Sequence, residues 1–193
     1  MNICVYGAAS NEIDKSYISA VEAFGEEMAK RGHTLVFGAG GGGLMGAAAR
    51  GVHRCGGKII GIIPSFFRDE TIEEIFDKCD ELIYTETMAQ RKDKMEELAD
   101  AFVTVPGGIG TFEEFFQVLT LKQLARHTKP IAIFDVNGYY AELNSFLNLS
   151  VKEKFINRDC YNLYLYSDNA TEILDYVEND ERIKKDVHEL KLG

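Results

Sequence analysis

The sequence predicts an α/β protein in which a Rossmann-like, doubly wound parallel sheet forms a single domain. Short apolar runs rich in β-branched residues alternate along the chain with amphipathic stretches of helical length. These runs are apolar nearly throughout, which is typical of parallel strands that are covered by helices on both faces. The chain has 193 residues and shows neither an internal repeat nor a linker, so one compact domain is expected.

Alternating strands and helices are expected throughout the first half of the chain. In order, they are a strand at 3–7, a helix at 16–31, a strand at 33–38, a helix at about 44–53 and a strand at 58–64. The first helix is indicated by Ile18, Val21, Phe24 and Met28, whose spacing places them on one face. Pro64 is expected to end the third strand, because proline lacks the N–H that a central strand needs.

The second half of the chain continues the same pattern. It contains a strand at 81–85, a helix at about 87–99, a strand at 101–106, a helix at 112–125, a strand at 130–135, a helix near 139–153, a short "YLY" strand and a helix at about 170–177. Residues 1–178 are therefore predicted to form a nucleotide-binding Rossmann-like domain. The polar residues 179–193 are expected to form a surface helix or a frayed tail.

Charge and composition exclude several classes of partner. The net charge of −10 argues against nucleic acid, whose phosphates are bound by basic surfaces. No apolar run reaches the length of a membrane span, and the first residues are predicted to be a strand rather than a signal peptide. The four cysteines are scattered and the histidines lack metal-ligand spacing, so we expect free thiols, a cytoplasmic protein, and no metal or cofactor.

Three loops at the carboxyl ends of the expected strands are candidates for ligand binding. They are residues 7–10, 38–46 and 106–111. The second, "GAGGGGLMG", is not a Walker A motif, because Gly43 is followed by Leu44 rather than lysine. A dinucleotide site is also disfavoured, since the stretch around Ile59 is apolar where an acidic ribose ligand should stand. Gly41, Gly42 and Gly43 are predicted to allow close approach of some other ligand.

The third loop, "VPGGIGTFEE" at 105–114, leads from a strand into a helix. Gly107, Gly108 and Gly110, together with Thr111, would present bare amides where the helix begins. Unpaired N–H groups and the helix dipole make such a terminus suitable for a phosphate.

Two carboxylates follow the same turn, and they allow a structural or a functional interpretation. Thr111 and Glu114 match a capping box, and Glu113 could be a first-turn acid that favours the helix dipole. Arg91 and Lys92, on the preceding helix, could be ordinary surface charges. In a parallel sheet, however, that helix starts at the same edge as the glycine turn, so the two cations would balance the carboxylates and a bound phosphate.

The stretches "TMAQRKDKMEELADAF" and "VPGGIGTFEE" resemble the Lonely Guy family, the cytokinin riboside 5′-monophosphate phosphoribohydrolases. That family pairs Met-x-x-Arg-Lys with Pro-Gly-Gly-x-Gly-Thr-x-x-Glu, matched here by Met88, Arg91 and Lys92 and by residues 106–114. The opening "CVYGAAS" and the "GGGGLMG" loop match as well, so the resemblance covers residues 1 to about 178. Some relatives carry a lysine decarboxylase label, but nothing in this sequence marks a pyridoxal-phosphate lysine.

The resemblance implies hydrolysis of the N-glycosidic bond of a nucleoside 5′-monophosphate, AMP or an N6-substituted AMP, to the free base and ribose 5-phosphate. Arg91 and Glu114 would be the catalytic pair, in a homodimer. The substrate-binding candidates are Met88, Lys92, Gly107, Gly108, Gly110, Thr111, Glu113, Gly41, Gly42 and Gly43. Ala89 and Gln90 depart from the histidine and the acid of many members, which makes cytokinin preference less secure than phosphate and ribose binding.

The reaction would pass through an oxocarbenium-like transition state that a carboxylate can stabilise. Glu114 is expected to favour its ionised form, because it lies near a helix N-terminus and Arg91. The alternative is a nucleotide-binding or carrier protein of the same fold, which would keep the glycine loops but would not need Arg91 and Glu114 together.

Overall fold

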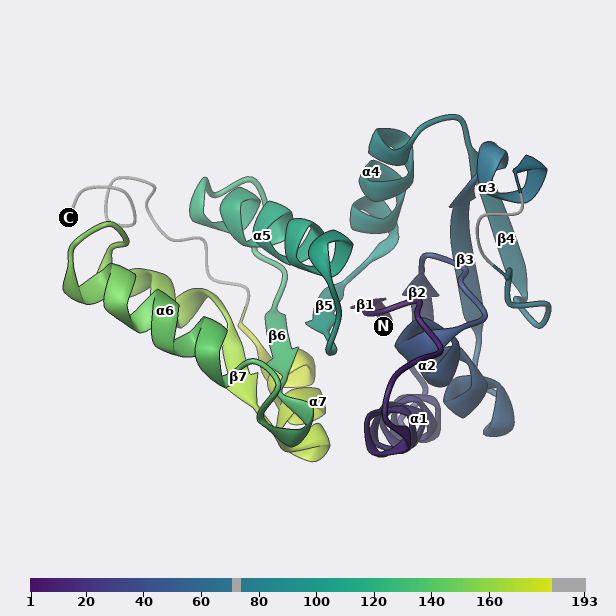
Figure 1. The fold of residues 1–193 in the computed structure, drawn as a ribbon, viewed down its shortest axis with the longest axis horizontal. Coiled ribbons are helices and arrows are strands. Elements are labelled where there is room, and N and C mark those ends of the chain that lie inside the picture. Colours follow the sequence, from purple (N-terminus) through teal and green to yellow (C-terminus); the bar gives the residue numbers. More distant parts are fainter. Residues whose placement is uncertain (71–73, 182–193) are drawn as a thin grey trace.

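The computed structural model describes residues 1–70 and 74–181, and it confirms a single α/β domain around one parallel sheet (Figure 1). Seven parallel strands lie in the order β4-β3-β2-β1-β5-β6-β7. They are β1 (Asn2–Tyr6), β2 (Thr34–Phe37), β3 (Ile59–Pro64), β4 (Glu81–Thr85), β5 (Ala101–Thr104), β6 (Ile131–Phe134) and β7 (Leu165–Ser167). Each of the seven expected strands is present.

Helices cover both faces of this sheet. The α-helices are α1 (Lys15–Lys30), α2 (Gly43–Arg54), α3 (Ser65–Asp69), α4 (Met88–Leu98), α5 (Ile109–Gln123), α6 (Ala141–Lys152) and α7 (Ala170–Asn179). One core cluster joins the sheet to α1, α2 and α7, and another joins it to α4, α5 and the segment before α6. In β1, Val5 faces the first cluster and Tyr6 the second, and both are buried. Burial on both faces explains why the strands are apolar at successive positions.

The structure differs from the sequence prediction mainly at element ends. Helix α5 begins at Ile109, three residues before the expected start at 112. Helix α3 and two short 3-10 helices, η1 (Val136–Gly138) and η2 (Arg158–Leu163), were not anticipated. The polar surface helix or tail expected at 179–193 lies outside the described residues from 182 onward, and its first residue, Asn179, is the last residue of α7. Within residues 1–70 and 74–181, no helix combines the length and apolar character needed to cross a membrane.

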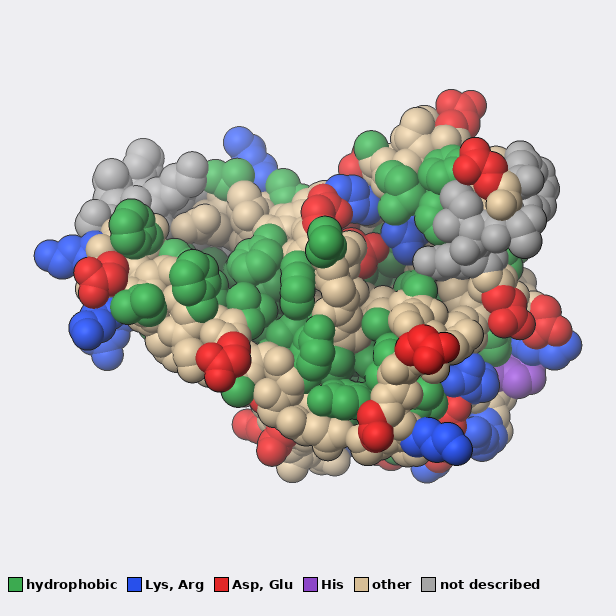
Figure 2. Space-filling view, viewed as in Figure 1, with side chains coloured by type: hydrophobic (Ala, Val, Ile, Leu, Met, Phe, Trp, Pro, Cys, Tyr) green, Lys and Arg blue, Asp and Glu red, His purple; other side chains and the backbone are tan. Residues whose placement is uncertain are grey.

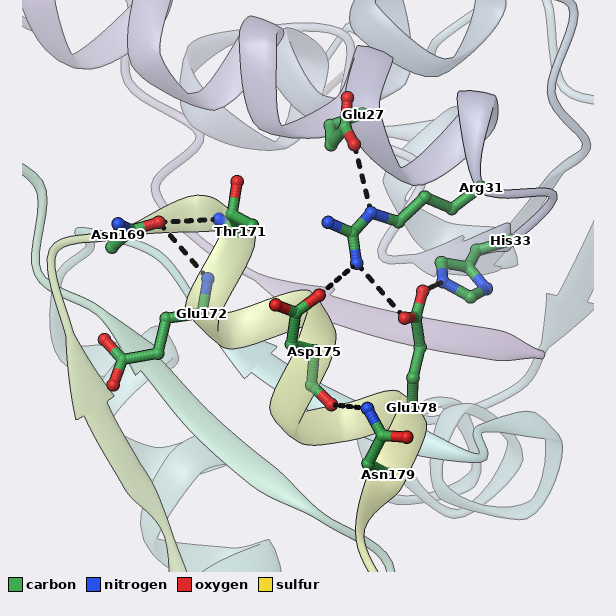
Figure 3. A network of polar contacts seen from close by, with 9 residues as sticks. All are labelled: Glu27, Arg31, His33, Asn169, Thr171, Glu172, Asp175, Glu178 and Asn179. Atoms are coloured by element: carbon green, nitrogen blue, oxygen red, sulfur yellow. Dashed lines mark hydrogen bonds and ion pairs between the residues drawn. The ribbon is translucent and has the colours of Figure 1, made fainter.

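A polar network connects α7 to the end of α1 and to His33 before β2 (Figure 3). The Arg31 guanidinium donates to Asp175 at 2.7 Å and to Glu178 at 3.1 Å, and its Nε donates to Glu27 at 3.0 Å. Glu178 also contacts Nε2 of the buried His33 at 2.7 Å. These contacts tie α7 to the segment that joins α1 to β2.

The sheet order creates a switch point between β1 and β5. From β1 the chain builds outward through β2, β3 and β4, and it then returns to place β5 on the other side of β1. The loops after β1 and β5 therefore leave the same edge of the sheet in diverging directions, which is where ligands bind in open α/β sheets. They touch through a hydrogen bond from Ala8 N–H to the Pro106 carbonyl at 3.1 Å.

Candidate active site

A cavity of about 370 Å³ lies at this switch point. The loop after β1 contributes Ala8 and Ser10 to its lining, and the start of α5 contributes Gly108, Gly110 and Thr111. The remaining lining residues are Gly7, Ala9, Met45, Phe67, Met88, Arg91, Glu113 and Glu114. Figure 2 shows the molecule hollowed between the α4 and α5 regions. Five of the residues predicted from the glycine turn and its carboxylates thus meet here with two from α4.

Arg91 is positioned by the way in which α4 begins. Thr87 caps the helix by accepting a hydrogen bond from Gln90 N–H at 3.1 Å, and the Gln90 side chain accepts one from Glu86 N–H at 2.8 Å. The first bond satisfies an amide that the first turn leaves unpaired, and the second ties the residue before the N-cap to the helix. Because α4 starts directly after β4, Arg91 lies in its second turn at the carboxyl edge of the sheet.

The Arg91 side chain forms a buried ion pair with Glu114. The distance from Nη1 to Oε1 is 3.0 Å, and the two side chains are 9% and 11% exposed. Nε also donates to the Ile62 carbonyl at 3.3 Å. The guanidinium passes over Gly38, where a Cβ atom would stand 1.7 Å from Nη2. Gly38 is therefore required by Arg91, a role that its place in a glycine loop did not reveal.

Glu114 is the sixth residue of α5, and its protonation differs from the sequence prediction. Burial raises the pKa of the Glu114 carboxyl, and the charge and hydrogen bond of Arg91 oppose this effect only in part. The helix dipole acts mainly within the first turn, and Glu114 lies beyond that turn. The expectation that the environment favours the ionised form is wrong in direction, because desolvation is the largest effect.

A second ion pair links the same two helices at the rim. Lys92 contacts the exposed carboxylate of Glu113 and donates to Gln117 Oε1 at 2.7 Å. Glu113 is the fifth residue of α5, so it is not the first-turn acid that the sequence allowed. Glu113 lines the cavity, whereas Lys92 is not one of the described residues that do.

The start of α5 leaves its amides open. The helix N-cap is Gly108, which supplies no side-chain cap, and side chains added at Gly108 or Gly110 would meet nothing within 4 Å. Thr111 is the third residue of the helix, and its buried side chain packs on Gly107, where a Cβ would stand 2.1 Å from Oγ1. The capping box is thus ruled out: Thr111 is not the N-cap, and Glu114 turns to Arg91.

The earlier glycine loop has a different environment from the predicted one. Gly41 N–H donates to the Glu74 carbonyl at 2.6 Å, and Gly43 N–H donates to Asn11 Oδ1 at 2.9 Å. A Cβ at Gly42 would stand 2.7 Å from the Ala9 carbonyl oxygen. None of these three glycines is among the described residues that line the cavity. These contacts pack neighbouring loops together. In this structure the three glycines therefore allow the backbone of another loop, rather than a ligand, to approach closely.

Other lining residues were missed by the sequence prediction. Gly7, Ala8, Ala9 and Ser10 belong to the loop 7–10, which had been marked as a candidate without individual residues. Met45 lies just beyond the glycine run. Phe67 lies in α3, a helix too short to leave a periodic pattern.

The chain is similar in sequence to a group of enzymes known from plants. A family model described as "Possible lysine decarboxylase" matches residues 45–177. The cytokinin riboside 5′-monophosphate phosphoribohydrolase LOG2 of Arabidopsis thaliana is 37% identical over 178 residues, which cover 91% of this chain and 82% of the relative. The corresponding enzyme LOG of Oryza sativa subsp. japonica is 37% identical over 174 residues, covering 89% and 70%.

Solved structures show the same fold at lower identity. The molybdenum cofactor carrier protein of Chlamydomonas reinhardtii superposes with a TM-score of 0.68 at 22% identity, covering 92% of this chain and 95% of that one. The molybdenum cofactor binding protein of Rippkaea orientalis gives 0.67 at 19% identity, covering 92% and 93%. Identities this low support the Rossmann-like fold and not a shared ligand.

Proposed function

This chain belongs to the Lonely Guy family of cytokinin riboside 5′-monophosphate phosphoribohydrolases, and from that membership we propose that it hydrolyses the N-glycosidic bond of a nucleoside 5′-monophosphate. The substrate is AMP or an N6-substituted AMP, and the products are the free base and ribose 5-phosphate. The observation that carries the proposal is the buried Arg91–Glu114 pair, which lines the same cavity as the open amides of α5.

The open amides supply the binding site for the 5′-phosphate. Gly108, Gly110 and Thr111 lie at the N-terminus of a helix of 15 residues and line the cavity. Unpaired N–H groups and the positive end of the helix dipole both attract an anion. With the phosphate held there, the ribose extends along the cavity toward Glu114.

Glu114 supplies the negative charge that the reaction needs. Breaking the bond between C1′ and the base nitrogen develops positive charge on the ribose, as in other glycoside hydrolysis. The ionised carboxylate stabilises that charge and orients the attacking water. Arg91 fixes the carboxylate through the 3.0 Å contact and keeps its burial from raising the pKa further. Met45, Phe67 and Met88 add apolar surface for the base.

The carrier alternative explains less of this arrangement. A carrier that only held a nucleotide would use the open amides, but it would gain nothing from a carboxylate whose pKa is raised by burial beside them. Carboxyls that face a cavity beside a charged partner, and whose pKa is raised by burial, are typical of catalytic sites. The pairing therefore favours turnover over storage.

Incubation with AMP tests the proposal directly. We expect ribose 5-phosphate and adenine to appear in equal amounts, measured by chromatography, with N6-substituted AMP compared in parallel. The Glu114→Gln variant, purified in the same way, controls for a contaminating hydrolase. Tight binding of AMP without either product would favour the carrier instead.

We also propose that the protein is a homodimer, and the exposed apolar side chains around α5 and α6 support this. Figure 2 shows hydrophobic side chains gathered on the face where α5 and α6 lie. The exposed large hydrophobic residues on these helices and directly after α6 are Ile109, Phe116, Phe146, Leu149 and Phe155. Phe146 is 63% exposed and Phe155 87% exposed, and large apolar side chains that gather on an exposed surface are typical of an interface. Light scattering should give twice the chain mass of 21.6 kDa, and a monomer would contradict the proposal. A cytoplasmic location stays a prediction.

A further inference from the structure

The turn that joins β5 to α5 is held at three consecutive carbonyl groups. Two of the three donors are the hydroxyls of adjacent tyrosines from the segment after β6, and the third is a backbone amide after β1. The bonds are Tyr140 hydroxyl to Val105 carbonyl at 2.8 Å, Ala8 N–H to Pro106 carbonyl at 3.1 Å, and Tyr139 hydroxyl to Gly107 carbonyl at 2.7 Å.

The tyrosine segment is itself anchored at the carboxyl end of β6. The buried Asp135 accepts a hydrogen bond from Tyr140 N–H at 2.7 Å and another from the Tyr166 hydroxyl. Between Asp135 and the tyrosines, Asn137 and Gly138 both adopt left-handed backbone angles, with φ of 56° and 71°. This tight turn directs both tyrosines back toward the glycine turn.

The bond to Gly107 controls the direction of a neighbouring amide. The Gly107 carbonyl and the Gly108 N–H belong to one planar trans peptide, so they point in opposite directions. Tyr139 lines a second cavity of about 340 Å³, while Gly108 borders both this cavity and the one that holds Arg91 and Glu114. Because Tyr139 holds the Gly107 carbonyl toward itself, the Gly108 N–H is directed away from Tyr139. A hydrogen bond accepted by the carbonyl also polarises the peptide and strengthens its N–H as a donor.

We propose that Tyr139 is a positioning residue for phosphate recognition, acting through the Gly107–Gly108 peptide. The inference rests on the proposed function, because it specifies how that site orients one of the amides for the 5′-phosphate. Its hydroxyl does not touch the substrate. Its effect is confined to ligands that carry the phosphate.

Tyr139→Phe removes the hydroxyl and leaves the ring in place. Tyr139 is 43% exposed, and its edge contacts with Tyr17 and Tyr140 do not involve the hydroxyl, so the melting temperature should change little. Calorimetry should show affinity for AMP and for ribose 5-phosphate falling about tenfold, which corresponds to about 1.4 kcal/mol. Adenosine affinity should stay within about twofold of the wild-type value, because adenosine lacks the phosphate.

Tyr17→Phe is the matched control, because Tyr17 lines the same second cavity and its hydroxyl has no hydrogen bond among the described residues. It should leave all three affinities unchanged. Unaltered binding of ribose 5-phosphate by Tyr139→Phe, or an equal loss for AMP and adenosine, would overturn the positioning role. A wild-type protein that binds AMP without cleaving it would refute the proposed hydrolysis and leave the Tyr139 comparison decisive. If the wild type bound neither AMP nor ribose 5-phosphate, both proposals would fall.

Discussion

Glu114→Gln tests the catalytic proposal most directly, because it removes a charge and keeps the shape. Glutamine retains an oxygen that can accept the hydrogen bond from Arg91 Nη1, which lies 3.0 Å from Oε1 of Glu114. What it loses is the negative charge facing the developing ribosyl cation. The Glu114 side chain is 11% exposed, so water screens this interaction weakly. Preorganised electrostatic groups of this kind contribute about 2.7–4 kcal/mol, which corresponds to a fall in kcat of about 100- to 1,000-fold.

The stability of this variant should change far less than its activity. A carboxyl whose pKa is raised on folding destabilises the fold as it ionises, and this penalty is fully present once the pH exceeds the raised value. Glutamine removes the penalty, but it also removes the charge that compensates the buried Arg91. Because these effects oppose each other, we expect the free energy of unfolding to stay within about 1 kcal/mol of the wild-type value.

The assay is release of ribose 5-phosphate from AMP at several substrate concentrations, with thermal unfolding followed by circular dichroism. Glu96→Gln is the matched control, because Glu96 is a partly buried carboxyl on α4 whose pKa is also raised by burial and which lies outside the cavity lining. It should keep near-normal kcat. If Glu114→Gln kept kcat within about threefold of wild type, the electrostatic reasoning would be wrong.

Three further results are expected from the same site. Gly38→Ala would place a methyl group 1.7 Å from Arg91 Nη2, so the flexible guanidinium should be displaced. We expect kcat to fall at least about 100-fold while the protein stays folded. Near-normal kinetics would show that the observed Arg91 position is not needed. Burial raises the pKa of Glu114 above its ordinary value of 4.5, so kcat should decrease as the pH falls through that raised value. A kcat that stays constant down to pH 4.5 would contradict an essential ionised Glu114. The kcat/KM for AMP should exceed that for adenosine by at least about 1,000-fold, because two or more charge-assisted hydrogen bonds to the phosphate help to orient the sugar. Similar kcat/KM values for both substrates would indicate a nucleosidase without a phosphate site.

Much of the fold could be predicted from the sequence because its strands are buried on both faces. Successive residues of β1, such as Val5 and Tyr6, enter different core clusters, so neither face is polar. That requirement leaves a continuous apolar run for each strand, and the alternation of such runs with helices indicates a parallel sheet. The weaker predictions were the ends of helices, since glycine-rich turns such as the one before Ile109 allow a helix to start at several positions.

The candidate pair was also accessible from sequence, because motif order and sheet geometry bring α4 and α5 to one edge. The contacts that define the chemistry of Arg91 and Glu114 could not be predicted from the sequence. The Arg91 guanidinium passes over Gly38, which directly follows β2. The glycine turn is held by Tyr139, which follows β6 in the chain. Each contact joins segments that are distant in the chain, and no local pattern records it.

The sequence by itself therefore determined the layered α/β architecture, the family and the residues Arg91 and Glu114 as candidates. Only the tertiary structure decided that Thr111 lies inside α5, that Gly41 and Gly43 bond to neighbouring loops, and that burial raises the pKa of Glu114. The physical reason is that periodicity and propensity act over a few residues, whereas desolvation and hydrogen-bond partners depend on which segments the sheet order brings together.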